Sequence, residues 1–152
     1  MHRRLPIVLP FVALATCDGG SEPPPADPLF PADYAATFTE VRDCRTSADH
    51  DLTHVRVFAD PVALDAYTTR GEPLPDGSLL VKEEHADETC TDLVGFAVMM
   101  REEGYDPDRG DWHWQKLDAD RRVTQDGRLE RCGGCHSLCE EPSGFDWTCA
   151  EP

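Results

Sequence analysis

The sequence predicts an α+β protein in which an antiparallel β-sheet is flanked by helices. Two observations predict this fold class. Several segments have the composition and alternation of β-strands, and turn-rich loops join them where a parallel sheet would need long crossover helices. The chain has 152 residues, 39% of them hydrophobic, which suits one modest domain with a small core.

The predicted helices are short and stand at both ends and near the middle of the chain. The first begins at Pro31, where a proline is tolerated, within residues 30–44. A second begins at Asp60 and Pro61, an N-cap followed by a proline, and runs through Tyr67. A third surrounds the cysteine-rich segment within residues 128–139. We expect these helices to pack on one side of the sheet.

Four segments are predicted to be strands, because they are rich in β-formers or alternate between apolar and polar residues: 52–59, 78–85, 93–101 and 111–117. Residues 93–101 are apolar on both faces, which indicates a central strand covered on both sides. On one face Gly95 and Ala97 are small. They leave room for a cofactor or a partner's side chains, or they allow tight packing against a helix.

The net charge of −16 excludes nucleic acid as a partner, because such binding requires lysine and arginine to neutralise phosphates. An acidic surface favours solubility or a basic protein partner. Lysine occurs only twice, at Lys82 and Lys116.

Residues 1–17 have the basic start and the short apolar run of a secretory signal, too short to span a bilayer. The segment "LATC" resembles the lipobox of bacterial lipoproteins, with Cys17 as the acylated residue. It predicts an exported lipoprotein, periplasmic or on the outer face of a membrane, that contacts the membrane through its lipid anchor only. Ordinary cleavage giving a soluble exported protein is the alternative. Residues 18–29 form an acidic, proline- and glycine-rich tether, and residues 30–152 form the folded domain.

Cys132, Cys135 and His136 form a C-x-x-C-H motif, the attachment pattern of a covalent c-type haem. The two thiols add to the haem vinyl groups, and the histidine that follows becomes the proximal iron ligand. We weighed a zinc site that adds Cys139, a redox dithiol and a strained disulfide between Cys132 and Cys135. The zinc ligands lie too close together in the chain, and the dithiol lacks its usual βαβ setting.

Of seven cysteines, one is assigned to lipid and two to haem, which leaves an even number in an oxidising compartment. Four cysteines permit three pairings. Our hypothesis pairs Cys139 with Cys149, which would pin the short tail, and Cys44 with Cys90.

Five segments, "LFPADY", "FADPVALDAYTTRGEPLPDGSLLVKEE", "VGFAVMMRE", "GDWHWQKL" and "CGGCH", occur in an order that resembles the cytochrome P-460 family, which includes the cytochromes c′-beta. The resemblance extends from Phe30 to Ser137. It implies an exported homodimer with an antiparallel sheet, flanking helices and one covalently attached haem c per chain. It also implies an iron with an open position that oxidises hydroxylamine or binds nitric oxide, both small nitrogen species.

The resemblance also assigns two positions of this chain. In the oxidising members a lysine of the "VKE" stretch, here Lys82, is cross-linked to the haem. A glutamate that lies over the open haem face corresponds here to Ala97. Its absence favours ligand binding over catalysis, since oxidising hydroxylamine releases protons and needs a base. A base from Glu83, Glu84 or His85 stays open.

A plain electron carrier is the alternative function, with Met99 as the sixth iron ligand. His54, His85 and His113 are expected to be exposed or structural. Whether the protein is an enzyme or a binder is left open, and a basic redox partner protein is expected in either case.

Overall fold

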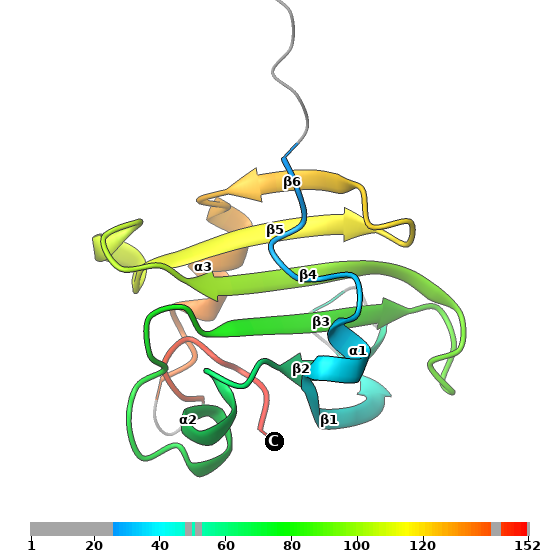
Figure 1. Ribbon diagram of the computed structural model, residues 1–152, viewed down its shortest axis with the longest axis horizontal. Helices are drawn as coiled ribbons and strands as arrows, with labels where there is room; N and C mark the ends of the chain where they lie inside the picture. Colours follow the sequence, from blue (N-terminus) through cyan, green and yellow to red (C-terminus); the bar gives the residue numbers. More distant parts are fainter. Residues whose placement is uncertain (1–25, 48–49, 51–52, 141–143, 152) are drawn as a thin grey trace, which may run out of the picture.

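A six-stranded antiparallel sheet forms the body of the protein, and each strand pairs with the strand that follows it in the chain (Figure 1). The computed structural model describes residues 26–47, 50, 53–140 and 144–151. The signal sequence with Cys17, and most of the tether, lie outside the described residues. The strands are β1 (Thr39–Thr46), β2 (His54–Ala59), β3 (Leu79–His85), β4 (Leu93–Arg101), β5 (Trp112–Asp118) and β6 (Val123–Gly127).

The helices of the described residues are short: α1 (Tyr34–Thr37), α2 (Leu64–Thr69), α3 (Glu130–His136) and a 3-10 turn at Pro107–Arg109. The protein is therefore mostly β, and the α+β assignment overstated its helical content. None of these helices has the length and apolar character needed to cross a membrane.

The sequence predicted the four inner strands and missed both edge strands. The helix expected within residues 30–44 stops at Thr37, and β1 begins at Thr39. β1 and β6 are mostly exposed along their length. An exposed edge strand has no buried face to impose apolar alternation, so the pattern that reveals a strand is weak there.

The helices cover both faces of the sheet, where we had expected one. On the first face, Tyr34 of α1 packs with Phe58, Val81 and Phe96. On the opposite face, Tyr67 of α2 belongs to a cluster with Leu80, Met99, Trp112 and Trp114, against which Cys132 of α3 is packed. Figure 1 shows α1 in front of the sheet and α3 behind it.

β4 is the doubly covered central strand that its composition predicted. Phe96 and Val98 point into the first cluster, whereas Met99 points into the second. Gly95 is small because the neighbouring strand runs very close: a Cβ atom there would lie 2.7 Å from the carbonyl oxygen of Leu117. Ala97, in contrast, is small at the wall of a cavity. The close neighbour of Gly95 is thus a strand, where a helix was the expected alternative, and Ala97 borders open space.

Two disulfides join Cys44 to Cys90 and Cys139 to Cys149, as hypothesised. The first links β1 to the loop after β3. The second closes the C-terminal segment onto the end of α3. Two such bonds are consistent with folding in an oxidising compartment.

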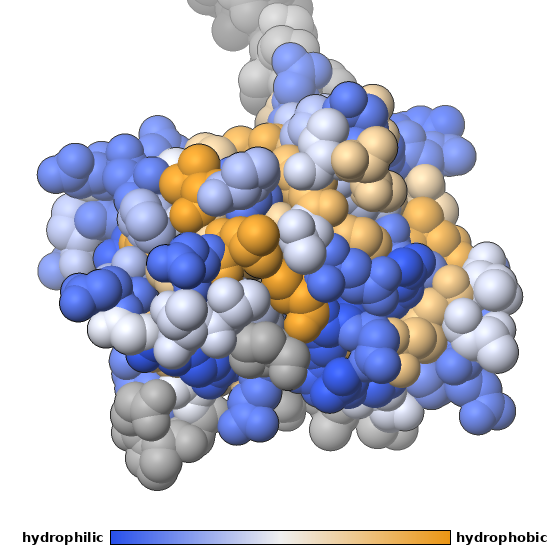
Figure 2. All heavy atoms as spheres, turned by 60° about the horizontal axis from the view of Figure 1, so that its bottom comes forward, coloured by the Kyte–Doolittle hydropathy of each residue, from blue (hydrophilic) through white to orange (hydrophobic). Residues whose placement is uncertain are grey.

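Hydrophobic residues also reach the surface. Figure 2 shows them gathered in a band across the middle of one face, surrounded by hydrophilic residues. Among the described residues, the large hydrophobic side chains that are exposed are Val62, Val94 and Leu138.

Replacing Gly95 by alanine should lower the free energy of unfolding by about 1–3 kcal/mol, because the new methyl group would press on the backbone of β5. Gly71→Ala is the control, since its nearest neighbour would lie 3.9 Å away. Urea unfolding followed by circular dichroism measures both. Equal stability of the two variants would contradict the close approach of β4 and β5.

Candidate functional site

A cavity of about 330 Å³ lies on the face of the sheet that α2 and α3 cover. Its volume is within the range of small-molecule and cofactor sites. Its walls come from the sheet, the segment after β1, α2, α3 and the C-terminal segment. The side chains that matter below are Arg42, His50, Lys82, Ala97, Met99, Trp114, Lys116, Arg131, Cys132, Cys135 and His136.

The strand register builds the floor of this cavity. Lys82 on β3 lies opposite Ala97 on β4, and Ala97 lies opposite Lys116 on β5. Directly paired residues have their side chains on the same face of a sheet. The small Ala97 therefore stands between the only two lysines of the chain.

α3 brings the C-x-x-C-H motif to the opposite wall. Cys132, Cys135 and His136 all lie on this seven-residue helix and line the cavity. The ring of His136 lies edge-on to Trp114, with 4.7 Å between the ring centres. The helix thus presents two thiols and an imidazole to the floor formed by the sheet.

The C-terminal segment determines which nitrogen of His136 carries the proton. The Nδ1 atom lies 2.7 Å from the carbonyl oxygen of Trp147. A carbonyl can only accept, so Nδ1–H donates, and in the neutral ring the lone pair is on Nε2. A histidine that binds a metal through one nitrogen commonly donates from the other in this way.

Several bonds hold the Trp147 carbonyl in place. The disulfide of Cys149 ties this segment to α3. Asp146 accepts a hydrogen bond from the backbone of Leu74 (2.7 Å) and pairs with Arg101 (3.1 Å). The tail disulfide therefore also helps to orient the imidazole of His136.

The cavity is positively charged in a strongly acidic protein. Arg42, Lys82, Lys116 and Arg131 line it, and no aspartate or glutamate is among the described residues that do so. The chain as a whole carries a net charge of −16. A cavity of this charge suits a ligand that bears carboxylates.

A hydrogen-bonded chain crosses one side of the cavity. Lys82 Nζ lies 2.8 Å from His50 Nε2, and His50 Nδ1 lies 3.0 Å from Glu84 Oε1. Lys116 donates to the same glutamate oxygen at 2.8 Å. Burial alone would raise the pKa of the Glu84 carboxyl, but the hydrogen bonds from His50 and Lys116 outweigh it and lower this pKa to about 2. Glu84 is therefore a fixed anion at neutral pH.

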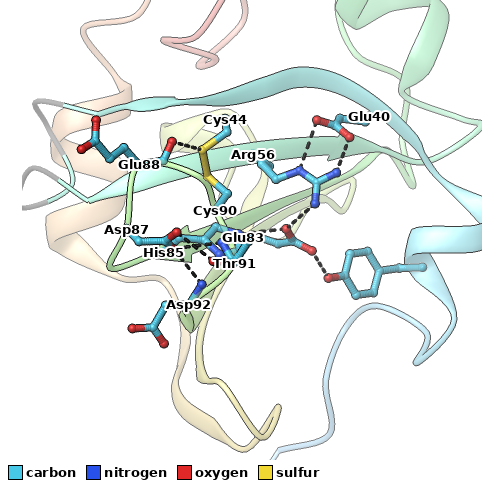
Figure 3. A network of polar contacts seen from close by, with 11 residues as sticks. Glu40, Cys44, Arg56, Glu83, His85, Asp87, Glu88, Cys90, Thr91 and Asp92 are labelled. Carbon is cyan, nitrogen blue, oxygen red and sulfur yellow. Dashed lines mark hydrogen bonds and ion pairs between the residues drawn. A yellow bond between two sulfur atoms is a disulfide. The ribbon is translucent and has the colours of Figure 1, made fainter.

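Glu83 and His85 do not belong to this site. They alternate with Lys82 and Glu84 along β3 and so point to the other face of the sheet. There His85 bonds to Glu83 at 3.0 Å, and Glu83 accepts a hydrogen bond from Tyr34 (Figure 3). Of the three acid–base residues that the sequence left open, only Glu84 is on the cavity face.

The geometry disfavours the other interpretations of the cysteine motif. Cys139 is bound to Cys149, so it cannot complete a zinc site. Cys132 and Cys135 are not joined to each other, and burial raises the pKa of the Cys132 thiol, whereas redox-active thiols have a lowered pKa. No group of three or more His, Cys, Asp or Glu residues in the described ranges is arranged to hold a metal ion.

Sequence reasoning missed three residues of the site. His50 lies in the segment between two strands, where no motif marked it. Trp114 lies within the predicted strand 111–117, but its contact with His136 arises only when the chain folds. Trp147 contributes only its backbone carbonyl, which leaves no trace in the sequence. Met99, the candidate sixth ligand, does line the cavity and is buried.

A c-type haem fits these residues. Two unpaired thiols and an imidazole with its Nε2 lone pair line one cavity, as covalent attachment and axial ligation require. Arg42 and Arg131 line the cavity and would balance the two haem propionates, while Lys116 is paired with Glu84.

Comparison with known proteins agrees with this fit. The model of the family described as Cytochrome P460 matches residues 31–143, which is most of the chain. No curated protein matches the chain.

Replacing Glu84 by glutamine should flatten the acid limb of the stability profile. The pKa of Glu84 is lowered from 4.5 to about 2 in the folded state, so its contribution is present above pH 4.5 and is lost as the pH falls towards 2. At pH 7 the free energy of unfolding of Glu84→Gln should be lower than that of the wild type by at most about 3 kcal/mol. Urea unfolding of both purified proteins, between roughly pH 2.5 and 7, measures how the free energy of unfolding depends on pH.

Glu103→Gln, at an exposed position, is the matched control for this experiment. Its profile should keep the wild-type slope. If the free energy of unfolding of Glu84→Gln also fell with decreasing pH as in the wild type, the ionisation of Glu84 would not be coupled to folding.

Proposed function

Because the chain belongs to the cytochrome P460 family, we propose that it is a mono-haem c-type cytochrome with an open iron position for a small nitrogen species, hydroxylamine or nitric oxide. The family implies the haem. The observation that carries the proposal is the convergence of Cys132, Cys135 and His136 on a single cationic cavity.

Each of these residues has a defined part in the proposal. The thiols of Cys132 and Cys135 form the thioether bonds, and His136 Nε2 is the proximal iron ligand. When bound, the haem supplies the iron on which a nitrogen ligand is held or oxidised. Arg42 and Arg131 line the cavity and would neutralise its carboxylates, and the hydrogen bond from His136 Nδ1 to the Trp147 carbonyl supports iron binding through Nε2.

Ala97 bears on whether the protein is an enzyme. Its methyl group lies in the cavity between Lys82 and Lys116 and offers no proton acceptor. Hydroxylamine oxidation releases protons, so an alanine there supports binding more than turnover by the route of the glutamate-bearing relatives.

The second candidate function is electron transfer by a six-coordinate haem. Met99 supports it, because its thioether lines the cavity and methionine is a usual sixth ligand of c-type cytochromes. Met99 also packs among Leu80 and Trp114, so a structural role explains its burial equally well.

The setting of the protein is part of the proposal. The two disulfides are consistent with export, and Cys17 is the proposed lipid anchor. The homodimer rests on the family resemblance. The net charge of −16 supports a basic redox partner protein.

Absorption spectra of the purified holo-protein should show a high-spin c-type haem that binds nitric oxide. A denatured sample should retain the haem, and Cys132→Ala combined with Cys135→Ala should lose it, because two thioether bonds hold it. A low-spin wild-type spectrum with a methionine-to-iron band would favour the electron carrier. A protein that takes up no haem would contradict the family assignment of its cofactor.

A Lys82 cross-link would shift the reduced Soret band strongly to the red. If the cross-link forms, Lys82→Arg should restore ordinary c-type features, and the mass of its haem peptide should be that of thioether attachment alone. Lys116→Arg is the matched control, since Lys116 is the chain's other lysine and lines the same cavity. Identical spectra of Lys82→Arg and the wild type would mean that no cross-link forms.

A further inference from the structure

His50 is a cavity residue that neither the sequence motifs nor the proposed function uses. It lies between β1 and β2, and its side chain is 19% exposed. Its ring and the ring of His136 line the same cavity, with 6.5 Å between their centres and an angle of 84° between their planes. The two imidazoles therefore border the same space, in which a ligand carried by His136 would be held.

The partners of His50 determine its tautomer. The Lys82 ammonium has only hydrogens to give, so His50 Nε2, 2.8 Å away, must accept. The proton of the ring is then on Nδ1, which donates to Glu84 at 3.0 Å. Lys116 holds the same carboxylate from the other side. The Glu84 charge therefore keeps the Nε2 lone pair of His50 directed at the amine of Lys82, another residue of the cavity wall.

A carboxylate behind a histidine fixes its orientation and raises the basicity of the far nitrogen. This makes His50 Nε2 a strong hydrogen-bond acceptor, and Lys82 beside it a donor. The strand position of Ala97 offers neither group. This acceptor and donor pair comes from the segment after β1 and from β3.

We propose that His50, oriented by Glu84, is the hydrogen-bond acceptor for a protic ligand on the iron, and that it favours hydroxylamine over nitric oxide. Hydroxylamine has O–H and N–H hydrogens to donate to Nε2, in place of Lys82, and its oxygen can accept from the lysine. Nitric oxide has no hydrogen and gains nothing from an acceptor. The inference rests on the proposed function and names the ligand class of the same site.

The test compares ligand affinities of the holo-protein with His50 intact or replaced. His50→Phe keeps a ring and removes the acceptor, His50→Gln keeps an acceptor, and His54→Phe is the control on the neighbouring strand. Hydroxylamine binding to the ferric protein and nitric oxide binding to the ferrous protein are followed by absorption under anaerobic conditions.

His50→Phe should bind hydroxylamine roughly five- to tenfold more weakly, which is the loss of one hydrogen bond. Its affinity for nitric oxide should stay within about twofold, and His50→Gln should recover most of the hydroxylamine affinity, since an amide oxygen can also accept. His54→Phe should match the wild type for both ligands.

Three results would overturn the inference. Hydroxylamine affinity that is unchanged in His50→Phe would show that no such bond forms. An equal fall for both ligands would show a structural role. A low-spin wild type that becomes high-spin in His50→Phe would make His50 an iron ligand. Failure of the proposed function is distinguishable, because it appears in the wild type as absent haem or a methionine-ligated spectrum.

Discussion

The site depends on the pairing register of β3, β4 and β5. This register sets Lys82, Ala97 and Lys116 side by side on the face toward α3. Because side chains alternate along a strand, the same register turns Glu83 and His85 toward Tyr34 on the opposite face. A slip by one residue would exchange the two sets. The hydrophobic clusters on both faces oppose such a slip, since each requires its own alternate residues of β3 and β4.

The wall opposite the sheet is held by covalent and polar bonds, with little apolar packing from its own helix. α3 has seven residues and one fully buried position, so it has little core to anchor it. The Cys139–Cys149 disulfide and the ion pair of Asp146 with Arg101 tie down the segment after it. Through the Trp147 carbonyl, the same bonds fix the orientation of His136. The same bonds therefore hold the C-terminal segment in place and orient the imidazole of His136.

Charge separates the interior of the site from the surface. The chain as a whole carries a net charge of −16, while the cavity is lined by cationic side chains, including both lysines of the chain. Glu84 moderates this charge by pairing with Lys116 and His50. Ala97 in the middle of the floor offers no polar group, whereas His50 on a neighbouring segment offers an imidazole that is hydrogen-bonded to Lys82 and Glu84.

Local patterns in the sequence determined the inner part of the sheet, the helix around the C-x-x-C-H motif and the haem assignment, because each is encoded within a few residues. The cysteine count allowed three pairings, and proximity in the fold selected Cys44 with Cys90 and Cys139 with Cys149. The polar edge strands β1 and β6 carry too little apolar alternation to be found from sequence. His50 and the Trp147 carbonyl reach the site only through tertiary contacts, across separations that no local pattern records. The C-x-x-C-H motif was thus a property of the sequence, and the groups that surround His136 were decided by the tertiary structure.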